Sequence, residues 1–232
     1  MIITIDGPTA SGKSTVAAWL AKKLGSTYLS SGWLYRAVAY ILTRDFGYTS
    51  EMLRNPKTVD IDYCLDMKRL VYRYDAVRGG VLLYDGVDIT YALKDCTVDA
   101  LVAIISPVPA VRERVTYAQK ERAAEVESCI VEGRDVGSVV FPYADYKFYL
   151  TASLEVRAQR WQKDQAKRGN VFTLDQAKQC IDSRDKKDQE RTHSPLVIPQ
   201  GAVVIDSSCS TIEQVVDQIC AVIDADKMGL RK

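Results

Sequence analysis

The sequence is poor in the residues that metal sites and disulfide frameworks need. It has one histidine, His193, in 232 residues, and its six cysteines are never closer than 11 positions apart, so no C-x-x-C pair occurs. Structural zinc sites draw their ligands from cysteines and histidines at close spacing. We therefore expect no structural metal site, and we interpret the cysteines as reduced thiols.

Long apolar runs and an excess of one charge are also missing. The longest stretch without a charge, residues 192–205, has 14 residues and two prolines, whereas a membrane-spanning helix needs about 20 mostly apolar residues. The first residues, MIITIDG, lack the positive charge of a secretory signal. The net charge of +1 gives no bulk attraction to nucleic acid or anionic lipid. We expect a cytoplasmic protein without a membrane or nucleic-acid partner.

Strand patterns alternate with helix patterns along the chain. A β-rich run at 1–6 precedes a helical apolar stripe at 13–24, one at 27–29 precedes a stripe from Gly32 to about Phe46, and one at 202–205 precedes a stripe after Ser210. Ser210 and Glu213 fit a capping box at the start of the last helix. The alternation predicts an α/β fold with a parallel sheet flanked by helices.

One region departs from this pattern. Between Asp66 and Asp95 the chain is rich in Val, Leu and Tyr and is punctuated by Gly79-Gly80 and Asp85-Gly86, both hairpin turn signals. We predict a small antiparallel meander inserted into the α/β core. Residues 81–85 also mimic a Walker B strand, but because the aspartate belongs to a turn signal we favour the hairpin.

The strongest chemical signal is the segment GPTASGKS at residues 7–14, which fits the P-loop pattern G-x-x-x-x-G-K-[ST]. It follows a predicted strand and opens a predicted helix, which is the context that the motif requires. In such a loop, backbone N–H groups surround the phosphates of a nucleoside triphosphate. Lys13 is expected to reach the β and γ phosphates, and the Ser14 hydroxyl to ligate Mg²⁺.

The P-loop does not identify the acceptor, but missing motifs narrow the class. The sequence has no N-K-x-D or T-K-x-D motif of a GTPase, no L-S-G-G-Q signature of an ABC ATPase, and no strand ending in Asp-Glu. A kinase of a small acceptor remains. Such an enzyme must neutralise charge on the transferring phosphoryl group, and arginines in loops and movable segments do this.

Four clusters could supply these arginines. The first, at residues 31–36, opens a helix, and the second, at residues 132–137, follows an apolar strand at 129–131, where open α/β sheets bind ligands. The third has Arg157 and Arg160 on a helix that Ser153 would cap, and the fourth, after Thr173, spaces Arg184, Asp188 and Arg191 along one helix face. Residues 157–191 hold 10 basic and 6 acidic side chains. A solvated helix surface with ion pairs is the alternative interpretation.

Together these motifs resemble the bacterial cytidylate kinases over essentially the whole chain. The resemblance rests on IDGPTASGKST at 5–15, SSGWLYRA at 30–37, GVDIT at 86–90, PAVRERV at 109–115, EGRDVGSVVFP at 132–142, LTASLEVRAQR at 150–160 and SRDKKDQER at 183–191. It implies a P-loop kinase CORE at 1–61 and 100–232 with a short helical LID at about 157–170. An inserted monophosphate-binding region would occupy 62–99.

The resemblance also implies the reaction and its residues. ATP would phosphorylate CMP or dCMP, giving ADP and CDP or dCDP, with Mg²⁺ bound to the ATP phosphates and no covalent intermediate. A monomer is expected. The ATP phosphates would lie on Gly7, Pro8, Thr9, Ala10, Ser11, Gly12, Lys13, Ser14 and Thr15. The acceptor would contact Ser31, Gly32, Tyr35, Arg36, Arg112, Arg134, Asp135, Arg184, Asp188 and Arg191.

Within this set the resemblance assigns distinct roles. Arg36, Arg112 and Arg134 would hold the acceptor phosphate, whereas Ser31, Asp135, Arg184, Asp188 and Arg191 would surround its sugar and cytosine. Lys13, Arg157 and Arg160 would act on the transferring group. Glu132 is a candidate to orient Mg²⁺ through a water molecule.

The sequence departs from the family pattern at the expected base site. Ser30 stands where an aspartate is common, Lys94 where an arginine is common, and Ala103 near a serine that reads the base in some members. These departures loosen the expected base recognition. Two alternatives stay open: another small-metabolite kinase, such as shikimate or dephospho-coenzyme A kinase, and a nucleotide-sensing regulator that binds without turnover.

Overall fold

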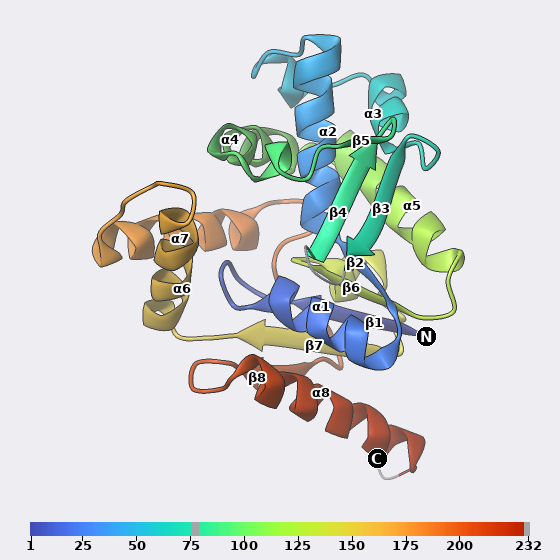
Figure 1. The fold of residues 1–232 in the computed structure, drawn as a ribbon, viewed down its shortest axis with the longest axis vertical. Helices are drawn as coiled ribbons and strands as arrows, with labels where there is room; N and C mark the ends of the chain where they lie inside the picture. The colour runs from blue at the N-terminus through green and yellow to red at the C-terminus, as the bar shows by residue number, and fades with distance from the viewer. Residues whose placement is uncertain (76–78, 230–232) are drawn as a thin grey trace. The chain divides into compact units, whose positions relative to one another are not determined.

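The computed structural model of the protein describes residues 1–75 and 79–229 (Figure 1). The chain forms two compact units, one made of Met1–Gly25 and Ile130–Lys232 and the other of Ser26–Cys129. These two units are defined by which residues pack together. The expected insertion at 62–99 is defined instead by monophosphate binding, so that division stays a prediction.

The first unit is built on parallel strands. β1 (Ile2–Asp6), β6 (Cys129–Gly133), β7 (Tyr146–Thr151) and β8 (Val203–Asp206) lie in the order β6-β1-β7-β8 within a five-stranded sheet. β1 pairs in parallel with β7, with Ile3 opposite Tyr146, and β7 pairs in parallel with β8, with Phe148 opposite Val203. The predicted α/β class with a parallel sheet is confirmed.

Helices of the first unit bury apolar stripes. α1 (Lys13–Leu24) follows the predicted bounds, and Gly25 caps it with a φ of 62°. The other elements are α6 (Leu154–Ala166), α7 (Leu174–Glu190), α8 (Ile212–Lys227) and the π-helical turn η3 (Val136–Val140). α1 and α8 contact each other.

No helix among the described residues combines the length and apolar character needed to cross a membrane.

The predicted start of α8 is wrong by one residue. Thr211 is the N-cap, its hydroxyl accepts from the N–H of Gln214 at 3.3 Å, and the Gln214 side chain accepts from the N–H of Thr211 at 2.9 Å. Ser210 and Glu213 do not form the capping box. The capping-box pattern fits the sequence twice, at Ser210 with Glu213 and one residue later at Thr211 with Gln214. In the structure only the second pair forms both hydrogen bonds of the box.

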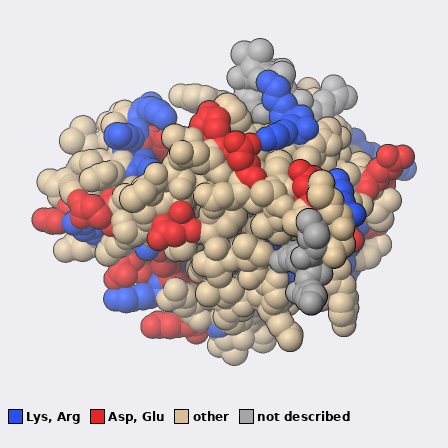
Figure 2. Space-filling model, turned by 90° about the horizontal axis from the view of Figure 1, so that it is seen from below, with Lys and Arg blue, Asp and Glu red and all other residues tan. Residues whose placement is uncertain are grey.

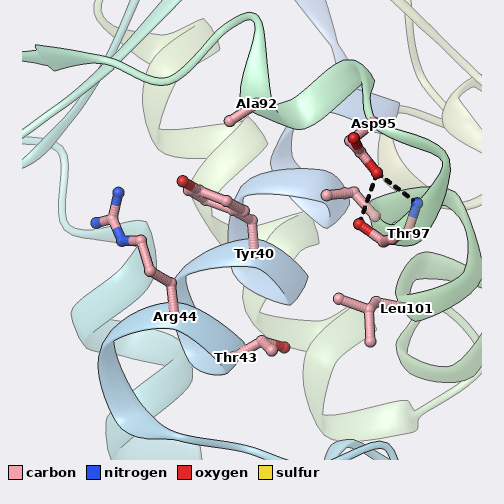
Figure 3. A pocket seen from close by; sticks show the side chains of 8 residues that line it. Tyr40, Thr43, Arg44, Ala92, Asp95, Thr97 and Leu101 are labelled. Atoms are coloured by element: carbon pink, nitrogen blue, oxygen red, sulfur yellow. Dashed lines mark hydrogen bonds between the residues drawn. The ribbon is translucent and has the colours of Figure 1, made fainter.

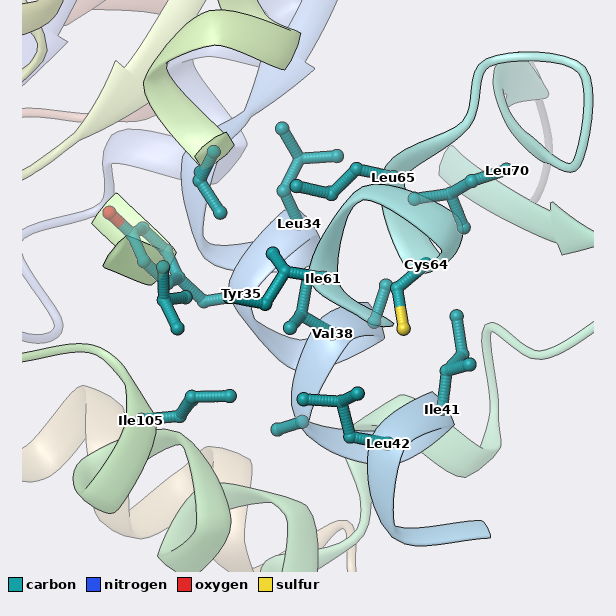
Figure 4. Packing of buried hydrophobic residues seen from close by; sticks show 14 of the residues in the cluster. Leu34, Tyr35, Val38, Ile41, Leu42, Ile61, Cys64, Leu65, Leu70 and Ile105 are labelled. Atoms are coloured by element: carbon teal, nitrogen blue, oxygen red, sulfur yellow. The ribbon is translucent and has the colours of Figure 1, made fainter. Parts of the chain in front are cut away.

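The second unit packs around α2 (Ser31–Phe46). Leu34, Val38, Ile41 and Leu42 are buried, as the helical stripe predicts, and Figure 4 shows them within a cluster of apolar side chains. Each such side chain contributes about 1.5–3 kcal/mol when it is fully buried, so this helix holds the unit together. α3 (Thr58–Leu65), α4 (Cys96–Ile105) and α5 (Pro109–Ala124) contact it. β2 (Thr27–Ser30) and the 3₁₀ turns η1 (Met52–Arg54) and η2 (Ala92–Lys94) complete the unit beside a small sheet.

The small sheet is antiparallel, as predicted. β3 (Leu70–Asp75) pairs with β4 (Gly79–Tyr84), which pairs with β5 (Val87–Asp88). Asp85 and Gly86 form the predicted turn with φ values of 50° and 80°. Asp85 pairs with Arg69, so the structure supports the hairpin interpretation over a Walker B strand.

The second predicted turn is wrong. Gly79 and Gly80 lie in β4, opposite Asp75 and Tyr74, and residues 76–78 between the strands lie outside the described part of the chain. A Cβ atom on Gly80 would lie 2.5 Å from the Tyr72 hydroxyl oxygen. Glycine at position 80 of β4 therefore allows the Tyr72 side chain of β3 to approach closely.

Candidate active site

The P-loop connects β1 to α1 in the first unit. Gly7 has a φ of 150°, and a Cβ atom there would lie 2.0 Å from the carbonyl oxygen of Leu150, so only glycine fits. Gly12, with a φ of 95°, ends the loop and precedes α1. Pro8, Ala10 and Ser11 complete the turn. The predicted strand, loop and helix context is confirmed.

Lys13 is held inside the loop. Only 5% of the residue is exposed, and its Nζ donates to the carbonyl oxygen of Pro8 at 2.6 Å and to Ser11 Oγ at 3.2 Å. Burial lowers the pKa of Lys13 well below its usual value, and the positive charge of Arg134 adds to this effect. Ser14 and Thr15 lie exposed in the first turn of α1. The Lys13 side chain is thus held in place by hydrogen bonds to the P-loop itself.

Asp6, at the end of β1, contacts the start of η3. Its two carboxylate oxygens accept from the N–H groups of Val136 and Gly137 at 2.8 and 2.7 Å. Burial raises the pKa of Asp6 to about 6, against the effect of these hydrogen bonds. The contact fixes η3 beside β1. Sequence reasoning missed this role, although a buried aspartate directly before the P-loop is a usable signal.

Thr9 is the meeting point of three segments. Its N–H donates to Asp185 Oδ1 at 2.8 Å, its carbonyl oxygen accepts from Arg157 Nη1 at 3.2 Å, and its hydroxyl accepts from Arg134 Nη2 at 3.3 Å. Arg157 also forms an ion pair with Asp185. The structure therefore brings Arg134 and Arg157 to the P-loop. Asp185 was not predicted.

Arg160 reaches the same loop by another path. It donates to the Ser207 hydroxyl at 2.9 Å and to the Ser207 carbonyl oxygen at 2.7 Å. It also donates to the carbonyl oxygen of Ser11 at 3.4 Å. Burial lowers the pKa of Arg160 from its usual value. Ser207, which follows β8, is a second positioning group that the motifs do not reveal.

Carboxylates and guanidinium groups alternate beside Thr9. Asp188 accepts from Arg134 Nε at 3.1 Å and from Arg191 Nη1 at 3.4 Å, and Arg191 Nη2 lies 3.9 Å from Asp135 Oδ1. Arg191 follows the last residue of α7, so the expected shared helix face holds only for Arg184 and Asp188. Arg184 is exposed on that helix, whereas Glu132 is buried in β6.

The second unit holds its predicted residues around the start of α2. Ser31 is buried and Gly32 is exposed in its first turn. Arg36 donates to the carbonyl oxygen of Leu93 at 2.9 Å and pairs with Asp99. Asp99 was not predicted.

Arg112 of α5 lies in the same unit and is 5% exposed. It donates to the carbonyl oxygen of Ser106 at 2.9 Å, and its guanidinium carbon lies 5.5 Å from the centre of the buried Tyr35 ring. Lys94 stacks over Trp33 at 5.8 Å, and Ala103 is exposed on α4.

A pocket of about 330 Å³ in the second unit contains none of the predicted site residues. Figure 3 shows Tyr40 and Arg44 on one side and Asp95 and Thr97 on another. Asp95 accepts from the N–H and hydroxyl of Thr97 at 2.8 and 2.7 Å, which caps α4. Its carboxylate therefore has a structural role.

Among the described residues, no group of three histidine, cysteine or acidic side chains could hold a metal ion. Mg²⁺ keeps several waters and takes few protein ligands besides substrate phosphates. The exposed Ser14 hydroxyl supplies the kind of oxygen ligand that it prefers.

Comparison with known proteins adds independent information. The family model described as Cytidylate kinase matches residues 3–225. A cytidylate kinase of Caldanaerobacter subterraneus subsp. tengcongensis is 35% identical over 228 residues, which cover 98% of this chain and 96% of that protein.

Solved structures show more distant likeness. An uncharacterized protein from Eubacterium ventriosum matches with a TM-score of 0.52 and 13% identity, covering 97% of this chain and 98% of that one. A shikimate kinase from Bacteroides thetaiotaomicron matches with a TM-score of 0.48 and 14% identity over the same shares, too distant to carry an argument. The likeness to the Eubacterium ventriosum protein, at 13% identity, shows the fold alone. Because the family model and the curated relative each span nearly the whole sequence, the chain belongs to the cytidylate kinase family and is a kinase.

Proposed function

We propose that this kinase transfers the γ-phosphoryl group of ATP to CMP or dCMP. The observation that carries the proposal is the P-loop surrounded by three arginines, with Arg134 and Arg157 on Thr9 and Arg160 on Ser11. Family membership supplies the acceptor class. Membership of a kinase family also disfavours a regulator without turnover.

The donor half of the reaction uses the first unit. Residues 7–15 would bind the ATP phosphates through backbone N–H groups and the start of α1. Lys13 would move from the Pro8 carbonyl to the β and γ phosphates. Arg157 and Arg160 would neutralise charge that develops on the transferring group.

The acceptor needs little activation. Its nucleophile is a phosphate oxygen that is largely ionised at neutral pH, since the second pKa of a phosphate monoester is about 6. A strong general base is therefore unnecessary. The remaining task is to bind two anions in line and exclude water, which alignment and positive charge accomplish.

We assign the acceptor contacts by the family resemblance. Arg36, Arg112 and Arg134 would bind the CMP phosphate. Ser31, Gly32, Tyr35, Asp135, Arg184, Asp188 and Arg191 would contact the rest of the nucleotide. Asp188, held between Arg134 and Arg191, is the candidate acceptor for the exocyclic amine of cytosine.

Mg²⁺ bound with the ATP phosphates would supply charge neutralisation. Ser14 would ligate the ion. Glu132, buried at the end of β6, would orient it through water.

The proposal also covers the setting of the reaction. We expect a cytoplasmic monomer that binds free nucleotides and neither nucleic acid nor membrane. Lys and Arg lie interspersed with Asp and Glu on the face shown in Figure 2, which suits a protein with a net charge of +1. Sedimentation of the purified protein tests the monomer, which a stable dimer would exclude.

An acceptor screen tests the function. ADP production with ATP and Mg²⁺ is measured for CMP, dCMP, UMP, shikimate and dephospho-coenzyme A, and without acceptor. We expect CMP or dCMP to give the highest kcat/KM. A preference for shikimate or dephospho-coenzyme A, or no ADP formation dependent on any acceptor, would contradict the proposal.

A further inference from the structure

Asp185 lies in the segment SRDKKDQER, but the family resemblance gives it no role in the site. It lies on α7, and 7% of its side chain is exposed. Its Oδ1 accepts the N–H of Thr9 at 2.8 Å, across 176 positions of sequence, and its Oδ2 pairs with Arg157 Nη1. One carboxylate thus contacts both the P-loop backbone and a cation expected at the transferring group.

The Asp185 carboxylate is one of three oxygen partners of the Arg157 guanidinium. The guanidinium also donates through Nε to the carbonyl oxygen of Ala152 at 3.0 Å and through Nη1 to the carbonyl oxygen of Thr9 at 3.2 Å. Carbonyl oxygens are neutral, so Asp185 is the charged partner in this set. Arginine is a long, flexible side chain that loses rotamer freedom when it is held in one place. Only 12% of the Arg157 side chain is exposed, so its ion pair with Asp185 restricts it strongly.

We propose that Asp185 is a positioning residue that sets the place of the Arg157 guanidinium relative to the P-loop. It acts through Arg157 and does not contact the nucleotide. The N–H of Thr9 orients the carboxylate, and the carboxylate orients the guanidinium. Misplacement of a catalytic group by about 1 Å can cost about 100-fold in rate, so this contact has a measurable effect.

A double-mutant cycle tests the proposal, which rests on the proposed function. The kcat of wild type, Asp185→Asn, Arg157→Ala and the double variant is measured at saturating ATP and CMP. We expect Asp185→Asn to lower kcat by about 10-fold to 100-fold in wild type and by less than about twofold in the Arg157→Ala background. A residue that only stabilises the fold would lower kcat equally in both backgrounds, and that result would overturn the proposal.

Asp182→Asn is the matched control. Asp182 lies on the same helix, has 46% of its side chain exposed, and pairs with Lys186 at 2.8 Å. Its replacement should leave kcat within about twofold of wild type. If Asp185→Asn does not fold, the cycle is run with Asp185→Glu, which keeps the charge but displaces it, and the same coupling to Arg157→Ala is required.

A second readout does not depend on turnover. In ¹⁵N NMR spectra of the whole protein, the Arg157 Nε–H signal should be ordered in wild type and Asp182→Asn and averaged by motion in Asp185→Asn. An equally ordered signal in Asp185→Asn would overturn the proposal even if CMP is not the acceptor. Failure of wild type to phosphorylate CMP would instead contradict only the proposed function.

Discussion

The two units hold their candidate arginines in different ways. In the first, Arg134, Arg157 and Arg160 contact the P-loop itself, through Thr9 and Ser11. In the second, Arg36 and Arg112 are anchored within their own unit, on the carbonyl oxygens of Leu93 and Ser106. The first arrangement fixes cations relative to the P-loop. The second fixes them relative to the core of the unit that carries them.

This difference suggests a division of labour. Arg157 and Arg160, held on the P-loop, are placed to stabilise the transferring group, so their loss should lower kcat. Arg36 and Arg112, anchored within the second unit, are suited to bind an acceptor that arrives separately, so their loss should raise the KM for CMP.

The largest effect is expected at Lys13. Lys13→Ala should lower kcat by at least about 1000-fold, because it removes the ammonium aimed at the β and γ phosphates. Far-ultraviolet circular dichroism should stay that of wild type. Lys22→Ala, on the exposed side of the same helix, is the control and should retain activity. Unchanged turnover of Lys13→Ala at saturating ATP would remove the P-loop from the mechanism.

The next effect concerns Arg157 and Arg160. Replacing either with alanine should lower kcat by about 100-fold and change the KM for CMP much less, because these side chains would act on developing charge. Steady-state kinetics with varied CMP at saturating ATP measures both constants. A rise in KM with an unchanged kcat would exclude both residues from the LID role.

Arg36 should show the opposite behaviour. Arg36→Ala should raise the KM for CMP by about 10-fold to 100-fold, because a charge-assisted contact to the acceptor phosphate is lost. The kcat should fall less. Arg114→Ala is the control in the same unit, since Arg114 pairs with Asp62 at 3.3 Å and has no proposed contact with substrate. An unchanged KM for Arg36→Ala would break the proposed division of labour.

The last expected effect concerns base recognition, and its lower bound is the smallest of the set. Asp188→Ala should reduce the ratio of kcat/KM for CMP over UMP by about 5-fold to 150-fold, because one buried pairing is worth about 1–3 kcal/mol. The wild type should prefer CMP. An unchanged ratio in the variant, or a wild type that uses UMP equally well, would remove Asp188 from the base-reading role.

The parts of the structure that local sequence determines were predictable. The glycines at 7 and 12, the apolar stripe of α2 and the Ser153 cap of α6 depend on neighbouring residues, and each is confirmed. Where two local registers compete, as at Ser210 and Thr211, the pattern alone does not decide. The side-chain contacts of the folded helix do.

The supporting residues of the site were not predictable in this way. Asp185 lies in the segment SRDKKDQER but received no role, Ser207 lies in no motif, and their partners on the P-loop are 176 and 196 positions away in sequence. Asp99 likewise meets Arg36 across 63 positions. Such contacts arise from tertiary packing, so spacing rules that work within one helix or loop do not reveal them.

Equilibrium binding of CMP tests the division of labour most directly. Isothermal titration calorimetry measures the Kd for CMP, without ATP, in wild type, Arg157→Ala and Arg36→Ala. The account predicts a Kd within about twofold of wild type for Arg157→Ala and about 10-fold to 100-fold weaker for Arg36→Ala. Equal weakening in both variants, or weakening only in Arg157→Ala, would contradict it.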